Sequence, residues 1–219
     1  MHSVSVTKTT PTLVDFHINC TFPVHFVSNH RKIAQFCDGS LEHNINSTIW
    51  IIDESKLLDP TQSPLEYSME LARSHHGVAV AVDDGHLLHS ITPAERLAGG
   101  SNSLPDGFQV LNYDSGNVIH GINEAADPSR SCLGFHGDSH VGDSYAFACN
   151  QTHGGILLVN YGQTPLYTSR AVSYPDGFEA HRTGTLTSHH GNSHVVGNFL
   201  VPGTTTTLWH SIHSKRNQQ

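Results

Sequence analysis

Two nearly identical stretches decide the fold: HGDSHVGD at residues 136–143 and HGNSHVVGN at residues 190–198. They begin 54 residues apart, and each leads into an apolar run, SYAFAC at 144–149 and NFLV at 198–201. Self-similarity at a period of this size is typical of repeat architectures, in which each repeat is one supersecondary unit. The first question about this chain is therefore how many such units it contains.

The spacing of the cysteines extends the repeat toward the start of the chain. Cys20 and Cys37 lie 17 residues apart, and so do Cys132 and Cys149. In both pairs a histidine follows the first cysteine, and the second cysteine closes an apolar run, KIAQFC or SYAFAC. With the pair His75-His76 between them, the chain divides into four units at steps of 51, 60 and 54 residues, headed by His25, His76, His136 and His190.

Short apolar runs separated by Asp-Gly, Gly-Gly or Pro-Gly turns fill the chain, which is the pattern of strands and hairpins. Only residues 64–73 (PLEYSMELAR) have a helical pattern, and that segment also suits an outer strand. The sequence therefore predicts an all-β protein. The expected strands are residues 32–37, 48–52, 77–82, 86–91, 107–113, 144–149, 155–161, 194–200 and 205–210.

Four repeated units of short strands predict a β-propeller of about four blades, each a four-stranded antiparallel sheet. The last unit ends after its third strand, and an early strand at 12–18 can complete it and close the ring. Alternatively, the ring is incomplete and the chain is part of a longer propeller. A two-sheet sandwich is the competing fold, but it does not predict a 54-residue repeat. We expect residues 1–219 to form one propeller domain, whole or partial.

Charge and composition narrow the classes of function. The 219 residues carry a net charge of -8, so no basic stripe is available for nucleic acid. The sequence contains no run of 18 apolar residues, so it predicts no membrane-spanning helix. Histidine is the outlier: its 19 residues equal Asp and Glu together, and full protonation would move the net charge to +11. Such a chain binds metal or responds to pH.

The repeat predicts where the histidines meet. The first strand of each propeller blade lines the central channel, so a histidine at the start of each blade converges with its counterparts. We therefore expect imidazoles to surround one axis and to bind Zn²⁺, which prefers four-fold nitrogen ligation. Copper and nickel also accept imidazole. The primary candidate ligands are His25, His76, His136 and His190.

A second metal site is expected from closely spaced histidines. The H-x3-H spacings of His136/His140 and His190/His194 can place two imidazoles of one loop on one ion. Asp138 is either an oxygen ligand or the acceptor that holds a ligating ring. The adjacent His75 and His189 complete the candidate set. The competing interpretation is architectural: a histidine in every blade satisfies a buried backbone group.

The cysteines also have competing interpretations. The equal spacing suggests two local disulfides, Cys20–Cys37 and Cys132–Cys149, which indicate an oxidising compartment. Zinc ligation by thiolates and free thiols are the alternatives, although no CxxC is present. No hydrolase, Walker or dinucleotide-binding motif appears, so we expect no enzyme.

Several long stretches resemble a known family. They are LPDGFQVLNYDSGNVIHGI with SCLGFHGDSHVGDSYAFACNQTHGGILLVNY, PVHFVSNHRKIAQFCDGS near the start, and RTGTLTSHHGNSHVVGNFL near the end. Over most of residues 20–200 they are similar to periplasmic zinc metallochaperones of the AztD type. The Cys-x3-His-Gly-Asp segment that ends in Phe-Ala-Cys is the most specific part. Members are β-propellers that bind zinc and deliver it to the solute-binding protein of a zinc ABC transporter.

The resemblance implies a disulfide at Cys132–Cys149 and zinc ligation by His25, His76, His136 and His190, with Asp138 nearby. It also implies a periplasmic or secreted location, although MHSVSVTKTTPTLVDF lacks the apolar core of a secretion signal and family members are typically longer. We expect a protein that stores or transfers zinc. The alternatives are a metal-dependent hydrolase or lactonase, and a protein-interaction propeller in which histidine is incidental.

Overall fold

The structure is a computed structural model, and regular secondary structure in it is almost entirely β-strand. Apart from a 3-10 turn at Glu54–Lys56, every element in the described part of the chain is a strand. No helix in that part is long and apolar enough to cross a membrane. The structure describes residues 2–5, 12–83, 85–91, 104–105, 107–123, 134, 136–149, 155–161, 167–174, 176–177, 182–189, 194–200 and 207–213.

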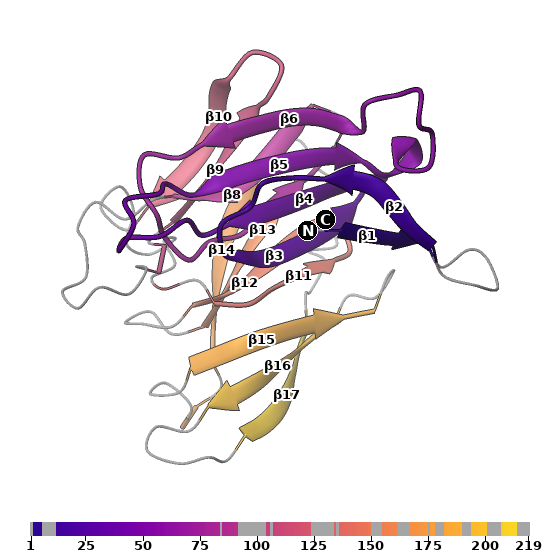
Figure 1. Ribbon diagram of the computed structural model, residues 1–219. Coiled ribbons are helices and arrows are strands. Elements are labelled where there is room, and N and C mark those ends of the chain that lie inside the picture. The colour runs from indigo at the N-terminus through magenta and orange to yellow at the C-terminus, as the bar shows by residue number, and fades with distance from the viewer. Residues whose placement is uncertain are drawn as a thin grey trace. The chain divides into compact units, whose positions relative to one another are not determined.

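The strands form successive sheets in which neighbours in sequence are neighbours in space (Figure 1). Three sheets have four strands, and the last has three. This series of small sheets is the blade architecture of a β-propeller, which confirms the predicted fold class. The sheets are β3 (Pro23–Asn29), β4 (Lys32–Cys37), β5 (Thr48–Asp53) and β6 (Leu65–Glu70); β7 (Ala79–Ala81), β8 (His86–Ser90), β9 (Gly107–Asn112) and β10 (Asn117–Asn123); β11 (Asp138–Val141), β12 (Ser144–Cys149), β13 (Gly155–Asn160) and β14 (Thr168–Ser173); and β15 (Arg182–Ser188), β16 (His194–Leu200) and β17 (Thr207–His213).

The chain divides into two compact units. The first comprises Met1–Ser103 with Val110–Ile119, and the second comprises Leu104–Gln109 with His120–Gln219. The boundary falls within β9 and β10, so both units contribute residues to that sheet. The single domain expected from the sequence remains a prediction.

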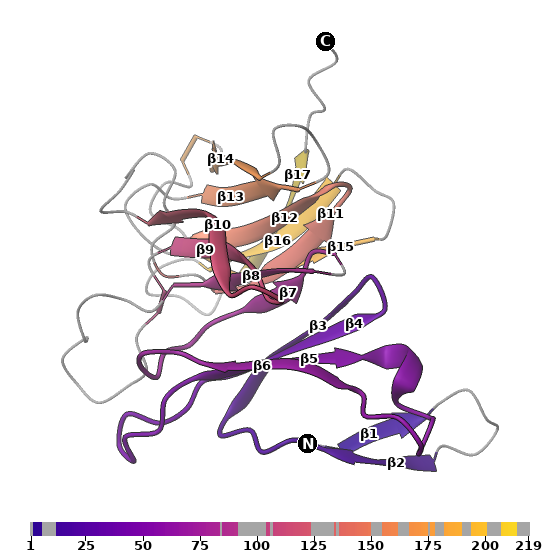
Figure 2. The same cartoon turned by 90° about the horizontal axis from the view of Figure 1, so that it is seen from above.

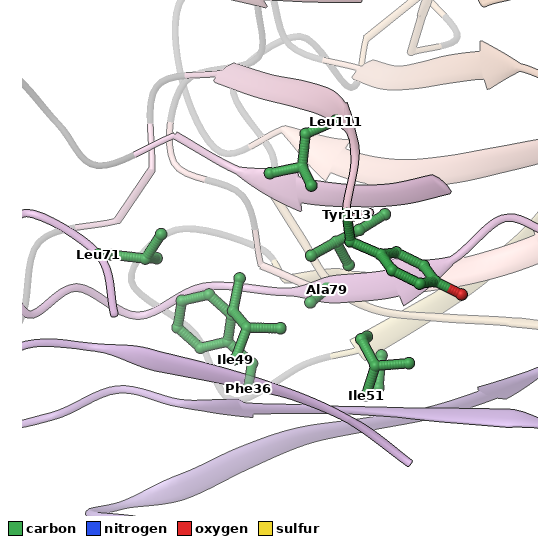
Figure 3. Packing of buried hydrophobic residues seen from close by; sticks show 9 residues of the cluster. Phe36, Ile49, Ile51, Leu71, Ala79, Leu111 and Tyr113 are labelled. Carbon is green, nitrogen blue, oxygen red and sulfur yellow. The ribbon is translucent and has the colours of Figure 1, made fainter. Parts of the chain in front are cut away.

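The core of the first unit lies on one face of the sheet β3–β6 (Figure 3). Alternation along β4 and β5 sends every second side chain to this face, and β7 packs against β3 and β4 of the same unit. Asn29 of β3 adds a hydrogen bond from its side-chain amide to the Ala81 carbonyl of β7, at 2.8 Å. The cluster comprises Ala34, Phe36, Ile49, Ile51, Leu71, Ala79, Leu87, Leu111 and Tyr113.

The segment predicted as helical or as an outer strand is the outer strand. Residues 65–70 form β6, the strand farthest from β3 in its sheet. Tyr67 and Met69 pack against the core of the first unit, whereas Glu66, at the alternate position, lies 2.6 Å from Lys32 Nζ. The apolar positions therefore follow the two-residue period of a strand rather than the 3.6-residue period of a helix.

The early strand does not complete the last sheet, contrary to one of the expectations. Residues 12–17 form β2 (Thr12–His17), which pairs with β1 (His2–Ser5) in a two-stranded sheet. A local hairpin closes a short loop at low entropic cost. Phe16 and Ile18 also bury against Ile33 and Ile52, so this segment lies along the second face of the sheet β3–β6 (Figure 2).

The 54-residue repeat does not mark equivalent positions in the sheets. His136 lies two residues before β11, the first strand of its sheet. His140 lies within β11, whereas its sequence counterpart, His194, begins β16, the second strand of the last sheet. The two similar segments therefore occupy different strands of their sheets. Aligning the blades by the sequence repeat matches the second strand of the last sheet with the first strand of the preceding sheet.

Candidate metal site

Two of the predicted ligands, His25 and His76, meet in the first unit. Their ring centroids are 5.2 Å apart, and the rings meet edge to face at 61°. His25 lies on β3 opposite Phe36 of β4, on the face that carries the core, and His76 lies in the segment that leads into β7. Because β7 packs on β3 and β4, residues 51 positions apart in sequence become neighbours.

An acidic residue that the sequence analysis missed completes this group. Asp38 directly follows β4, and its Oδ2 lies 2.8 Å from Nδ1 of His76. Both side chains are largely enclosed, with exposed fractions of 7% for Asp38 and 22% for His76. A carboxylate only accepts hydrogen bonds, so Nδ1 of His76 carries the proton and, in the neutral ring, Nε2 carries the lone pair. In the sequence, Asp38 was part of an Asp-Gly turn signal.

The neighbouring His75 has a different environment. Its side chain is fully buried, with Nε2 3.1 Å from Ser90 Oγ and its backbone N–H donating to Ser47 Oγ at 2.9 Å. Burial, with smaller contributions from the nearby His89 and His76, lowers the pKa of His75 to about 4. The structure therefore encloses His75 in the core, whereas it leaves the adjacent His76 partly accessible.

A further buried histidine lies close by and was not among the predicted site residues. His89 on β8 is almost completely enclosed, and its Nδ1–H donates to the Ser90 carbonyl at 2.8 Å. Burial lowers its pKa to about 4. His75 and His89 are thus neutral at physiological pH and belong to the packed interior.

In the second unit, His136 is fixed through its Nδ1. That atom lies 2.9 Å from the carbonyl oxygen of Gly184 on β15, so Nδ1–H donates and Nε2 carries the lone pair. The ring itself is exposed. Gly137 permits the approach of the two segments, because its φ is +105° and a Cβ there would lie 2.8 Å from the same carbonyl.

His140 and Asp138 lie on β11, two residues apart and therefore on the same face of the strand. Nε2 of His140 forms a hydrogen bond with the hydroxyl of Tyr161. The ring also lies edge-on to Tyr145, at 5.9 Å. Burial raises the pKa of Tyr145 well above its usual value, and Asp138 and Tyr161 add to this.

The remaining predicted ligands lie around the start of the last sheet. His189 follows β15 and is exposed, and His194 begins β16 and is half-buried. His190, between them, lies outside the described residues. Among the residues that the structure does describe, no three His, Cys, Asp or Glu side chains are grouped closely enough to hold a metal ion.

The disulfide expected near the start of the chain is present. Cys20 and Cys37 are bonded, with their Cα atoms 5.4 Å apart, so the link ends one residue before Asp38. Cys149 is disulfide-bonded as well, and Cys132, its predicted partner, lies outside the described residues. Thiolate ligation by Cys20 and Cys37 is thereby excluded in this oxidised form.

Small antiparallel sheets with histidines near their first strands define a histidine-bearing propeller, and comparisons with known proteins agree with this class. The chain is 26% identical over 192 residues to the zinc chaperone AztD of Citrobacter koseri, covering 86% of this chain and 39% of that protein. Two solved structures of AztD from the same species, one in the apo state, match with TM-scores of 0.68 and 0.64 at 23% identity.

The structural matches cover 96% and 93% of this chain but 53% and 49% of the AztD chains. The chain thus spans about half the length of the solved relatives and less of the curated one. No family model matches the sequence. The predicted resemblance to AztD-type zinc chaperones is confirmed in sequence and in fold.

Proposed function

We propose that this protein binds zinc as cargo through His25 and His76 and passes it to an acceptor protein. The observation that carries the proposal is the 5.2 Å between the two ring centroids. Two imidazoles bound to one tetrahedral zinc through bonds of about 2.0–2.1 Å have centroids roughly 5 Å apart. The pair therefore has the spacing that shared ligation of one ion requires.

The chemistry of the donors also supports zinc. With Nδ1–H of His76 donated to Asp38, the ring lone pair is on Nε2, a buried atom, and the Asp38 carboxylate brings a negative charge to the positive ion. Imidazole is a ligand that zinc favours, and the likeness to a protein named a zinc chaperone makes zinc the first metal to test. Copper and nickel remain the competing metals in the same assay.

A site with only two described histidines suits transfer. Zinc held by two protein nitrogens keeps coordination positions for water or for the ligands of an incoming acceptor, so ligands can exchange one at a time. His136, with Nε2 as its lone-pair nitrogen, and the neighbouring Asp138 and His140 are candidates for a second, separate site. His75, His189, His190 and His194 remain candidate ligands from the sequence.

The acceptor that the resemblance favours is the solute-binding protein of a zinc transporter. A periplasmic or extracellular location agrees with the Cys20–Cys37 disulfide, because such bonds persist in oxidising compartments.

The test is zinc binding by variants of matched histidines. We expect the wild-type chain to bind zinc in competition with a chromophoric chelator, and His25→Ala or His76→Ala to weaken one site at least tenfold. His86→Ala is the control, because His86 lies in the same unit and is also paired with a carboxylate, Asp83 at 2.7 Å. Absence of zinc binding in the wild type, or equal losses in all three variants, would contradict the proposal.

A further inference from the structure

We propose that Asp38 is a positioning residue for zinc: its carboxylate holds Nδ1–H of His76 so that Nε2 presents the lone pair to the ion. This inference rests on the proposed function and assigns a role to a residue outside the histidine repeat. Its basis is the 2.8 Å contact between Asp38 Oδ2 and His76 Nδ1, in a setting where both groups are largely shielded from water.

Asp38 is itself held through both its backbone and its carboxylate. The backbone N–H of Asp38 donates to the Phe22 carbonyl at 3.0 Å, and its own carbonyl accepts from Ser47 Oγ at 2.8 Å. Its Oδ1 accepts a longer hydrogen bond, 3.4 Å, from the N–H of Gly77, the residue after His76. Asp38 therefore contacts both the ring of His76 and the backbone beside it, which restricts the ring in position and rotation.

The charge on Asp38 adds to the effect of its geometry. A ligating histidine commonly donates its second N–H to a carboxylate or carbonyl, which fixes the tautomer and raises the basicity of the metal-binding nitrogen. The acceptor of His136 is a neutral group, the Gly184 carbonyl. The acceptor of His76 is a negatively charged carboxylate, so we expect His76 to be the stronger zinc ligand of the two.

The same unit provides a matched control. Asp83 and His86 form a carboxylate–imidazole contact of 2.7 Å in the turn between β7 and β8, and Asp83 also accepts from the backbone N–H of Gly85. His86 begins β8, whereas the ring that meets His25 is that of His76. Asp83→Asn therefore changes the same chemical group in the same way, without touching the proposed site.

The experiment measures tautomers and zinc affinity separately. Two-bond ¹H–¹⁵N spectra of apo protein labelled in histidine report which ring nitrogen of His76 is protonated. We expect the Nδ1–H tautomer in the wild type, and in Asp38→Asn a ring signal shifted toward the Nε2–H tautomer, because the amide can present N–H groups to Nδ1. Zinc affinity should fall 10- to 100-fold in Asp38→Asn, the usual cost of losing such a partner, and stay unchanged in Asp83→Asn.

Two results would overturn the inference: an Nε2–H tautomer of His76 in the wild-type apo protein, or wild-type zinc affinity in a folded Asp38→Asn variant. The tautomer measurement needs neither zinc nor a variant, so it decides the positioning role even if Asp38→Asn does not fold. If the wild type shows the Nδ1–H tautomer but binds no zinc, the proposed function fails while the contact between Asp38 and His76 stands.

Discussion

Single hydrogen bonds separate the histidines of this chain into two chemical kinds. His76 and His136 have Nδ1 hydrogen-bonded to an acceptor, and their rings are only partly enclosed or exposed. His75 and His89 are enclosed and neutral, and their pKa values are lowered to about 4 by burial. Composition alone shows 19 histidines, but only the contacts separate enclosed, neutral rings from rings that remain partly exposed.

The buried kind makes stability depend on pH. His89 titrates near pH 6.5 when unfolded and near pH 4 when folded, so acid protonates the unfolded chain first. Its contribution is fully present above pH 6.5 and is lost as the pH falls toward 4. We expect urea unfolding of His89→Asn, which keeps a donor for the Ser90 carbonyl, to lose about 2–3 kcal/mol less between pH 7 and pH 4.5 than the wild type. Equal losses in the two proteins would contradict this assignment.

At the scale of single residues, the sequence pointed to some of the histidines that come together but not to the carboxylate that contacts one of them. The repeat correctly drew attention to His25 and His76, which do meet. It could not identify Asp38, because an Asp-Gly pair after a strand has the same appearance whether it only turns the chain or also holds an imidazole. The partner of Asp38 lies 38 residues away, and that pairing depends on how β7 packs against β4.

Among the elements, the two faces of the hairpin β3–β4 should contribute very differently to the free energy of unfolding. Phe36 on β4 is fully buried in the core of the first unit, whereas Phe26 on β3 is 55% exposed on the other face. We expect Phe36→Ala to lower the free energy of unfolding by about 3–5 kcal/mol, because it leaves a cavity, and Phe26→Ala to lower it by less than about 1 kcal/mol. Chemical denaturation of the two variants compares the faces directly, and similar losses would show that the assignment of core and surface is wrong.

The strands that the sequence predicted are those with apolar runs. Residues 32–37, 144–149 and 194–200 form strands with the predicted bounds, and each is central in its sheet. The first two bury side chains on both faces, which gives them a continuous apolar run. Polar edge strands such as β14 (TSRAVS) and β15 (RTGTLTS) give no such signal, and they were not predicted. The last blade was misaligned for this reason: without β15, the second strand of the sheet was counted as the first.

For the molecule as a whole, zinc binding and acidity should oppose each other. A ligand that binds only the folded state stabilises it by about 2.7 kcal/mol at a free concentration of 100 Kd. Imidazoles release metal when they are protonated, so this gain should shrink below about pH 6. We expect zinc to raise the thermal midpoint at pH 7.5 and to raise it far less at pH 5.5. An equal increase at both pH values would indicate that histidines are not the ligands.

The covalent bridge between Cys20 and Cys37 bears on how the protein should be prepared. It ends next to the carboxylate that holds His76, and it ties the end of β4 to the chain that precedes β3. Thiol additives, or expression in a reducing cytoplasm, would free that strand end and let Asp38 drift from the imidazole. Zinc titrations on such material would not test the proposed site with Asp38 in place, so the cysteines should be shown to be oxidised before any affinity is assigned.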